Sequence, residues 1–438
     1  MIYVEVSTLF DWSWSGIANV TANLCRVLVD QGRQVGFFAF DRLVSASFVQ
    51  NALTINDGAG LGLLFEQGFA DGGSILARPE PRDNEVAIYP NFKRSHQHFA
   101  RELLIVHDLS FDLTPEFHRP NYAAEYARRI YRDAHEVDHI CCVSEATRRD
   151  LIRYYRVPAE KVFVAHNGVE FGIEATSDIS ASLLKDLELS SGEYFLVLGT
   201  IEPRKNIGLL LGHLRSKLNV PNLNVLNKYK FVFVGRDGWG KTFHQLCVEN
   251  GTVDPRIIHL GYLSDVFRKE LLRNCAALIY PSMFEGFGMP VIEGMAAGVP
   301  VLVSRSSSLV ELGVDEDMSF DPCSQESFAE VFERFLQLSP DGRKRIGINN
   351  RARARQFTWS GFAQKLLART GHGMDLSRAP DETDPKLGEN KPAASRPDDS
   401  VSKGLGAPLI STANDAMWSQ ASMVEPERPQ AGRSRPKR

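Results

Sequence analysis

The sequence has few cysteines and almost no net charge, and both scarcities restrict what the chain can be. Six cysteines occur in 438 residues, and none has a Cys-x-x-Cys spacing, so neither a disulfide framework nor a cysteine zinc site is indicated. Lysine and arginine total 50 against 54 aspartates and glutamates, a net charge of −4. With no overall positive field to attract nucleic acid or anionic lipid, any phosphate-binding site must be local.

Long apolar runs are also missing. The N-terminal residues 1–6 lack the basic start and extended apolar stretch of a signal peptide. No window reaches the roughly 20 apolar residues that a membrane-spanning helix needs. We therefore expect a cytoplasmic protein that is at most peripheral to the inner face of a membrane.

What is present is an α/β pattern. The 43% hydrophobic and 24% charged residues are typical of a globular protein, and the length predicts two or three domains. Short apolar runs alternate with segments of helical period up to about residue 370, which is typical of parallel sheets covered by helices. The predicted strands are residues 2–6, 35–40, 85–89, 103–106, 139–143, 162–165, 194–198, 230–234, 257–260, 276–280 and 301–304.

These strands form two series of similar size, which predicts two doubly wound domains that face each other. A loop-like stretch rich in Ser, Asp and Glu separates them, and a tail rich in Pro, Ser, Asp, Gly and Lys follows the second. Such a tail has too little apolar surface to offset its ordering entropy, so we expect it to be disordered. The expected divisions are a first domain over 1–171, a linker over 172–192, a second domain over 193–370 and the tail over 371–438.

The most informative stretch runs from Tyr280 to Pro300. An apolar strand ends at Tyr280, glycines follow, and Pro290 suits the first turn of a helix. Free N–H groups at that helix start, aided by the helix dipole, would bind an anion such as phosphate. Glu285 and Glu293 flank this site, and their carboxylates are suited to accept hydrogen bonds from hydroxyl groups.

Here the chain resembles the family-four retaining glycosyltransferases, enzymes of the GT-B fold that transfer a sugar from a nucleotide diphosphate donor. The two glutamates, Glu285 and Glu293, are separated by seven residues and followed by Gly-Val-Pro, and they match the family's signature. The resemblance covers about residues 1–370 and implies two Rossmann-like domains around a cleft, the first on the acceptor side and the second on the nucleotide-sugar side. Other matches occur in the expected order at Gly16-Ile17, His107-Asp108, Ser144-Glu145, His166-Asn167-Gly168-Val169, Glu202-Pro203-Arg204-Lys205-Asn206 and Gly261-Tyr262.

The resemblance also implies a role for each matching residue. Arg204 and Lys205 would hold the donor pyrophosphate, as suits a guanidinium fork and an ammonium point charge; the alternative is a solvated basic pair. Glu285, with the backbone of Gly286, Phe287 and Gly288, would bind the transferred sugar. His107, at the end of an apolar strand, would face that sugar across the cleft.

The remaining implied contacts concern the nucleotide and the diphosphate. Glu293 would bind the ribose diol, and Gly261 and Tyr262 would present backbone groups to the base. Three residues would lie near the diphosphate or the sugar, namely Gly16, Gly235 and Arg236. One departure stands out, because many relatives have an arginine three residues after the first of these glycines and this chain has Asn19.

Two segments suggest other chemistry. Residues 235–242, Gly-Arg-Asp-Gly-Trp-Gly-Lys-Thr, satisfy the P-loop pattern and would indicate a nucleotide triphosphatase. That reading needs a later strand ending in Asp to hold magnesium, and the two candidates run into Pro281 and Arg305 instead. Residues 315–317, Asp-Glu-Asp, resemble a metal-binding acid pair but follow a predicted helix end, so we expect a solvated loop and no metal site.

We therefore expect an enzyme that transfers a hexose to an acceptor hydroxyl with retention of configuration, in surface polysaccharide or glycolipid biosynthesis. The Glu-Pro-Arg-Lys-Asn motif resembles that of mannosyl- and rhamnosyltransferases, which favours GDP-mannose as donor and requires no cofactor. The partners would be this donor and a glycan or lipid-linked acceptor, and not nucleic acid. The alternatives are a P-loop nucleotide triphosphatase or a catalytically inactive donor-binding subunit, which Asn19 favours.

Overall fold

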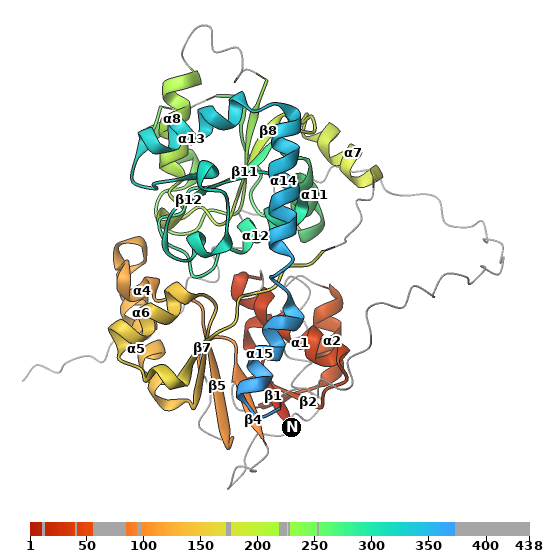
Figure 1. The fold of residues 1–438 in the computed structure, drawn as a ribbon, viewed down its shortest axis with the longest axis vertical. Helices are drawn as coiled ribbons and strands as arrows, with labels where there is room; N and C mark the ends of the chain where they lie inside the picture. The colour runs from red at the N-terminus through yellow and green to blue at the C-terminus, as the bar shows by residue number, and fades with distance from the viewer. Residues whose placement is uncertain are drawn as a thin grey trace, which may run out of the picture. The chain divides into compact units, whose positions relative to one another are not determined.

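The computed structural model confirms the α/β architecture, with two largely parallel sheets and helices packed against them (Figure 1). It describes residues 1–10, 14–39, 42–55, 85–93, 99–171, 177–218, 226, 228–251 and 254–372. Of the expected tail, only Gly371 and His372 are described. The predicted disorder of the residues that follow stays a prediction.

The first sheet has the strand order β3-β2-β1-β4-β5-β6-β7, and β3 alone runs antiparallel to its neighbour β2. Its strands are β1 (Ile2–Glu5), β2 (Val35–Ala39), β3 (Arg42–Val44), β4 (Val86–Tyr89), β5 (Arg101–Val106), β6 (His139–Cys142) and β7 (Val162–Val164). We call the described residues up to 171 the first half. Its helices are η1 (Ser7–Phe10), α1 (Gly16–Asp30), α2 (Ala46–Ile55), α4 (Ser110–Leu113), η2 (Pro115–Phe117), α5 (Pro120–Glu136), α6 (Glu145–Tyr155) and η3 (Ala159–Lys161).

The second sheet has the order β10-β9-β8-β11-β12-β13, and every recorded pair in it is parallel. Its strands are β8 (Tyr194–Leu198), β9 (Lys230–Val234), β10 (Ile257–His259), β11 (Ala277–Tyr280), β12 (Val301–Ser304) and β13 (Ser319–Phe320). We call residues 177–358 the second half. The helices after residue 171 are α7 (Ser177–Asp186), η4 (Pro203–Lys205), α8 (Ile207–Leu218), α10 (Phe243–Glu249), α11 (Asp265–Asn274), α12 (Met289–Ala297), η5 (Ser307–Leu312), η6 (Glu316–Met318), α13 (Gln325–Gln337), α14 (Pro340–Ala354) and α15 (Trp359–Arg369).

Helix α15 corrects the expected end of the second domain. Although residues 359–369 fall within the predicted range 193–370, α15 packs on α1 of the first half (Figure 1). Two hydrogen bonds hold the C-terminal segment on the first half. The N–H of Val169 donates to the carbonyl of Phe357 at 3.1 Å, and Arg101 Nη1 donates to the carbonyl of Thr370 at 2.8 Å. We therefore add residues 359–372 to the first half, which then consists of two separate parts of the chain.

The predicted linker also differs from the expectation. Residues 172–192 were expected to be loop-like, yet they contain α7, which packs against α11. Residues 177–186 thus form a helix of the second half. Serine and aspartate in its first residues, which suggested a loop, are equally compatible with a helix start.

The order of the second sheet determines where a ligand would bind. The chain builds outward from β8 in one direction through β9 and β10, and in the other through β11, β12 and β13. The connections after β8 and β11 therefore diverge to opposite sides, which opens a crevice at the carboxyl ends of these two strands. Arg204 and Lys205 follow β8, and Glu285 follows β11.

Candidate active site

The two predicted cations lie in the short helix η4, just beyond the carboxyl end of β8. After η4 the chain turns through Asn206, a residue in the left-handed region with φ 55°. The Asn206 side-chain amide donates to the carbonyls of Pro281, at 3.2 Å, and Pro322, at 2.9 Å. This anchor fixes the end of η4 against the loop that follows β11.

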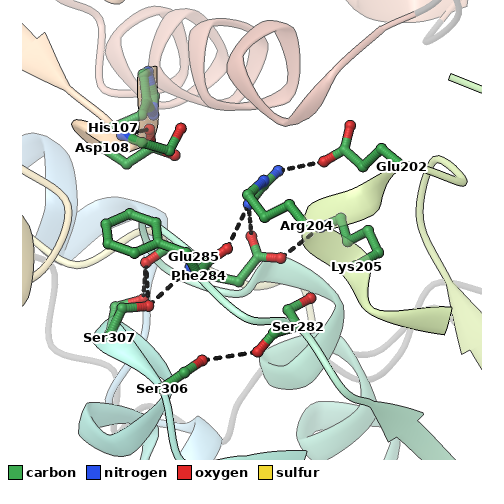
Figure 2. A network of polar contacts seen from close by, with 12 residues as sticks. His107, Asp108, Glu202, Arg204, Lys205, Ser282, Phe284, Glu285, Ser306 and Ser307 are labelled. Atoms are coloured by element: carbon green, nitrogen blue, oxygen red, sulfur yellow. Dashed lines mark hydrogen bonds and ion pairs between the residues drawn. The ribbon is translucent and has the colours of Figure 1, made fainter. Parts of the chain in front are cut away.

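Arg204 and Lys205 converge on Glu285 (Figure 2). Arg204 Nη1 is 2.8 Å from Glu285 Oε2, and Lys205 Nζ is 2.6 Å from Glu285 Oε1. Arg204 also donates through Nη1 to the carbonyl of Phe284 at 2.8 Å and through Nη2 to Glu202 Oε1 at 2.7 Å. The result is a compact cluster of two cations and two carboxylates, which we call the cation cluster.

The two carboxylates of the cation cluster differ in their proton affinity. Burial acts to raise the pKa of Glu285, but the charges of Arg204 and Lys205 outweigh it and lower that pKa to about 2. At Glu202 burial dominates over its ion pair with Arg204, and the pKa is raised. Glu285 is therefore ionised throughout the neutral range and cannot supply a proton to a reaction there.

Tyr280, the last residue of β11, completes the cation cluster. Its hydroxyl accepts from Lys205 Nζ at 2.8 Å and donates to Glu285 Oε1 at 3.0 Å. The ammonium of Lys205 also lies 5.0 Å from the centre of the Tyr280 ring, within cation–π range. The tyrosine thereby orients both charged groups, a role that sequence reasoning missed.

The loop after Glu285 brings the two halves of the protein together. A side chain at Gly286 would place its Cβ 2.0 Å from the carbonyl oxygen of His107, so only glycine fits there. Gly288 has φ 102° and caps α12 without a side-chain hydrogen bond. Anion binding at the start of α12, expected from the glycines and Pro290, stays a prediction.

His107 lies at the end of β5, beside this loop. Its Nε2 donates to the carbonyl of Pro90 at 2.7 Å, because a carbonyl oxygen can only accept. Burial lowers the pKa of His107, and the imidazole is therefore neutral with its proton on Nε2. Figure 2 shows His107 and Asp108 across from Arg204, with Phe284 and Glu285 below them in this view.

Glu293 lies away from the cation cluster, in a pocket of about 330 Å³. Its partner is Arg268 of α11, which donates to both carboxylate oxygens and also to Asp265 Oδ1, at 2.8 Å. The pocket brings together α11, α12, the segment that joins the halves and α1, where it includes Asn19. Met289, the first residue of α12, lines the pocket, and none of the residues of the cation cluster does.

The other residues predicted to contact the nucleotide sugar differ in their exposure and in their contacts. Gly16 is the first residue of α1, and the backbone N–H of Gly235 donates to the carbonyl of Gly261 at 2.7 Å. The Arg236 and Tyr262 side chains are exposed, and the latter retains 54% of its accessible surface. Phe287 is instead buried in the core between His166 and Phe357, so only its backbone could contact a ligand.

The P-loop-like segment does not have P-loop geometry. The Lys241 ammonium pairs with the Glu249 carboxylate, at 2.6 Å from Oε2, and about half of each side chain is exposed. Thr242 is the N-cap of α10 and accepts from the N–H of Gln245, which engages the hydroxyl that would otherwise bind magnesium. These contacts oppose a nucleotide triphosphatase site.

The acidic triplet at 315–317 differs from the expected loop, because Glu316 and Asp317 begin the 3-10 helix η6. Asp315 caps η6 through the N–H of Asp317, and Asp317 pairs with Arg334 at 2.9 Å. Within the part of the chain that the structure describes, no group of three His, Cys, Asp or Glu side chains is arranged to bind a metal ion. In the same part, no helix is long and apolar enough to cross a membrane.

Comparison with known families decides the assignment. Residues 91–171 match the model of Glycosyltransferase Family 4, and residues 183–353 match the model of Glycosyl transferases group 1, together more than half of the chain. This chain is a glycosyltransferase. The glycosyltransferase is 29% identical over 289 residues to O-antigen chain mannosyltransferase B of Escherichia coli, an alignment that covers 65% of this chain and 74% of the relative.

Solved structures show that the glycosyltransferase has the GT-B fold. Sucrose-phosphate synthase from Thermosynechococcus elongatus superposes with a TM-score of 0.61 at 16% identity, covering 84% of this chain and 98% of the other. HepE from Anabaena, in complex with UDP and glucose, has a TM-score of 0.57 at 17% identity, with coverage of 84% and 98%. The predicted fold class and family resemblance are both confirmed.

Sequence reasoning missed several partners of the predicted residues. Tyr280 and Glu202 flank the cations, and Arg268 pairs with Glu293. Glu202 and Tyr280 belong to motifs that the sequence analysis recognised. Because Glu202 follows β8 and Tyr280 ends β11, their positions could have indicated that they lie near the cations. Arg268 gave no such signal, because its contact with α12 joins residues that are 25 positions apart.

Proposed function

We propose that this glycosyltransferase transfers a hexose, with mannose favoured, from a nucleotide diphosphate sugar to a hydroxyl group of a glycan or lipid-linked acceptor. Transfer would retain the anomeric configuration, as in the family-four enzymes that the sequence resembles. It would need neither a metal ion nor a cofactor, because two fixed cations can neutralise the leaving diphosphate. The site residues are those predicted from the sequence, with the partners that the structure adds.

One observation carries this proposal: Arg204 and Lys205 are held side by side in the crevice after β8, and both contact Glu285 in the loop that leads into α12. The Nε of Arg204 is buried without a hydrogen-bond partner among the described residues. A diphosphate bound here would contact the charged groups of Arg204 and Lys205, the Nε–H of Arg204 and the N–H groups at the start of α12. Few other ligands match so many convergent donors.

The proposed chemistry follows from where charge develops. As the bond between the sugar and the diphosphate breaks, negative charge grows on the leaving oxygen, and preorganised donors stabilise it. Glu285 holds both cations in place before the donor binds. When the diphosphate takes over hydrogen bonds from Arg204 and Lys205, the ionised Glu285 can accept from hydroxyl groups of the sugar.

The nucleoside would occupy the pocket at Glu293. This residue lies five positions beyond Gly288, about 7.5 Å along the helix at 1.5 Å per residue, so one helix serves both the diphosphate and the ribose. Arg268 offsets the charge of Glu293 and keeps its carboxylate directed into the pocket. The ribose diol would then donate to that carboxylate.

Two observations favour mannose as the transferred sugar, the name of a similar protein and the sequence motif that starts at Glu202. The Escherichia coli relative is named an O-antigen chain mannosyltransferase, and the motif at Glu202 resembles that of mannosyltransferases. We therefore propose GDP-mannose as donor and an extracellular polysaccharide or a glycolipid as the final product. The first half, which carries His107, would bind the acceptor.

The alternative is a donor-binding subunit without turnover, and the observation that favours it is Asn19. This residue lines the pocket with an uncharged amide at the place where many relatives have an arginine. Both functions predict nucleotide binding. Only the enzyme releases a nucleoside diphosphate from a nucleotide sugar, so a donor-hydrolysis assay separates them.

A thermal-shift screen of GDP, GDP-mannose, UDP and UDP-glucose tests the proposal. A ligand present at 100 times its Kd stabilises the folded protein by about 2.7 kcal/mol, which is easily detected as a rise in Tm. We expect stabilisation by GDP and GDP-mannose, and less by GMP, which lacks the second phosphate. Equal shifts with GMP and GDP would contradict a site built around the diphosphate.

A further inference from the structure

The glycines of the P-loop-like segment have a structural reason in this protein. Residues 235–240 lie alongside residues 199–203, and a Cβ at Gly235 would be 1.9 Å from the carbonyl oxygen of Gly199. The N–H of Ile201 donates to the carbonyl of Arg236, and the N–H of Gly238 donates back to that of Ile201, both at 2.9 Å. The loop is therefore fixed to the strand extension that leads into Arg204.

Trp239, between two of these glycines, reaches the first half of the protein. Its indole N–H donates to the carbonyl of Phe117, and its ring stacks on His118 at 5.5 Å between centres and 30° between planes. His118 in turn contacts the ring of Phe111 at 4.3 Å and Ser110 Oγ at 3.0 Å. The tryptophan thus connects the second half to the whole segment 110–118.

Segment 110–118 lies beside the cation cluster. It directly follows His107 and Asp108, and the N–H of Ser110 donates to Asp108 Oδ1 at 2.9 Å. His118 is buried, and both its burial and the charge of Arg204 lower its pKa. The imidazole of His118 is therefore neutral, and Asp108, two residues before the segment, lies across from Arg204 in Figure 2.

We propose that Trp239 is a positioning residue for sugar transfer, which holds segment 110–118 of the acceptor-side half against the cation cluster. This inference rests on the proposed function and adds a residue to it. Trp239 touches neither Arg204, Lys205 nor Glu293 among the recorded contacts, so it acts through Phe117 and His118. Its effect is to fix the wall of the cleft that faces the donor sugar.

The expected consequence is a separation of binding from turnover. Arg204, Lys205 and Glu293, the side chains assigned to the diphosphate and the ribose, lie in the second half, and Trp239 contacts the first half at Phe117 and His118, not at Gly16 or Asn19. Transfer does need the first half to be in place, and a displacement of about 1 Å in positioned groups can cost about 10²-fold in rate. Loss of the tryptophan should therefore lower kcat and leave the affinity for GDP unchanged.

The test compares Trp239→Ala, Trp239→Phe and the control Glu249→Gln, which changes a charge at the end of α10 without touching Trp239. Each protein is assayed for GDP affinity by calorimetry, for GDP release from GDP-mannose, and for hydrogen exchange of the amides in 110–118. For Trp239→Ala we expect wild-type GDP affinity, a kcat lower by about 10²-fold and faster exchange in 110–118. Trp239→Phe keeps a stacking ring but no N–H donor, and should lie between wild type and Trp239→Ala.

The outcomes separate this inference from the proposed function. If the wild type neither binds GDP nor releases it from GDP-mannose, the proposed function has failed. If the wild type is active and Trp239→Ala matches it in kcat and in exchange, the role of Trp239 is wrong. A parallel loss of GDP affinity and kcat in Trp239→Ala would also contradict it, because the tryptophan would then support donor binding.

Discussion

The Glu285 carboxylate joins two cations in a nearly closed site, with 9% of its side chain exposed. Its folded-state pKa of about 2 lies below the ordinary 4.5, so its ionised form stabilises the fold. This stabilisation is complete above about pH 4.5 and is lost as the pH falls toward 2. Glu285 therefore links local stability to the integrity of the cation cluster.

Glu285→Gln should destabilise the protein strongly at neutral pH. The substitution leaves Arg204 and Lys205 buried without their shared partner, and breaking a buried pair typically costs about 3–5 kcal/mol. Denaturant unfolding at pH 7 measures this loss, with the exposed Glu330→Gln of α13 as control. The difference between wild type and Glu285→Gln should shrink at pH 3, and a difference that grows there would contradict the low pKa.

Glu293 provides a contrasting residue, because its proposed partner is the ribose in ground and transition states alike. Glu293→Gln weakens charged hydrogen bonds worth about 1.5–3 kcal/mol, which corresponds to about 10- to 10²-fold in affinity. We expect a higher KM for GDP-mannose with kcat retained. A fall in kcat at unchanged KM would place Glu293 at the reacting sugar instead.

At the scale of elements, the loop 235–242 shows how one sequence pattern can satisfy two different structures. Its glycines permit close backbone approach in both, but here the neighbour is residues 199–203 and not a phosphate. The lysine and threonine then differ in role, because Lys241 pairs with Glu249 and Thr242 caps α10. The pattern alone could not distinguish these outcomes.

Lys241→Ala tests this assignment. Because the Lys241–Glu249 pair is about half exposed, its loss should affect sugar transfer only moderately and stability by at most about 1 kcal/mol. The measurement is magnesium-dependent hydrolysis of ATP and GTP by wild type and variant, beside GDP release from GDP-mannose. A wild-type triphosphatase activity that disappears in Lys241→Ala would overturn the glycosyltransferase site.

The strands were more predictable than their surroundings. Central parallel strands are buried on both faces and form continuous apolar runs, so β8 and β9 were predicted with their observed bounds. The edge strands β3 and β13, three and two residues long, were missed because such short segments carry little pattern. Helix α7 was missed because its polar start suggested a loop.

At the scale of the whole molecule, α15 makes the chain return to the half in which it began. The alternating pattern extends to about residue 370 but could not show which half this last segment joins, since that depends on contacts with α1 more than 300 residues earlier. The same limit applied to the site. Motif order brought Arg204, Lys205 and Glu285 together correctly, whereas the pairs Arg268–Glu293 and Trp239–His118 arise only from folding.

Two truncations test where the folded body ends. Deleting everything after Met374 should leave Tm and GDP affinity nearly unchanged, because the deleted residues include few apolar side chains. Ending the chain at Thr358 removes α15 and its buried Trp359, Phe362, Leu366 and Leu367, worth about 1.5–3 kcal/mol each. That sum reaches the total stability of a typical domain, about 5–15 kcal/mol, so the shorter protein should unfold.

A stable protein from the shorter truncation would contradict the docking of α15 on α1. Conversely, a clear loss of Tm on removal of the residues after Met374 would show that the tail packs on the body. Circular dichroism melting of the three chain lengths distinguishes these results. The comparison requires no knowledge of the substrate.

The central claim is that Arg204 stabilises the leaving diphosphate of a nucleotide sugar, and the kinetics of GDP release from GDP-mannose by wild type and Arg204→Ala test it most directly. Removing one preorganised donor of this kind typically costs about 10²–10³-fold in kcat. We expect a loss of that size, with a smaller change in KM and with Lys205→Ala behaving in the same way. A wild type that releases GDP while both variants keep its kcat would contradict the account, because the cation cluster would then have no part in the reaction.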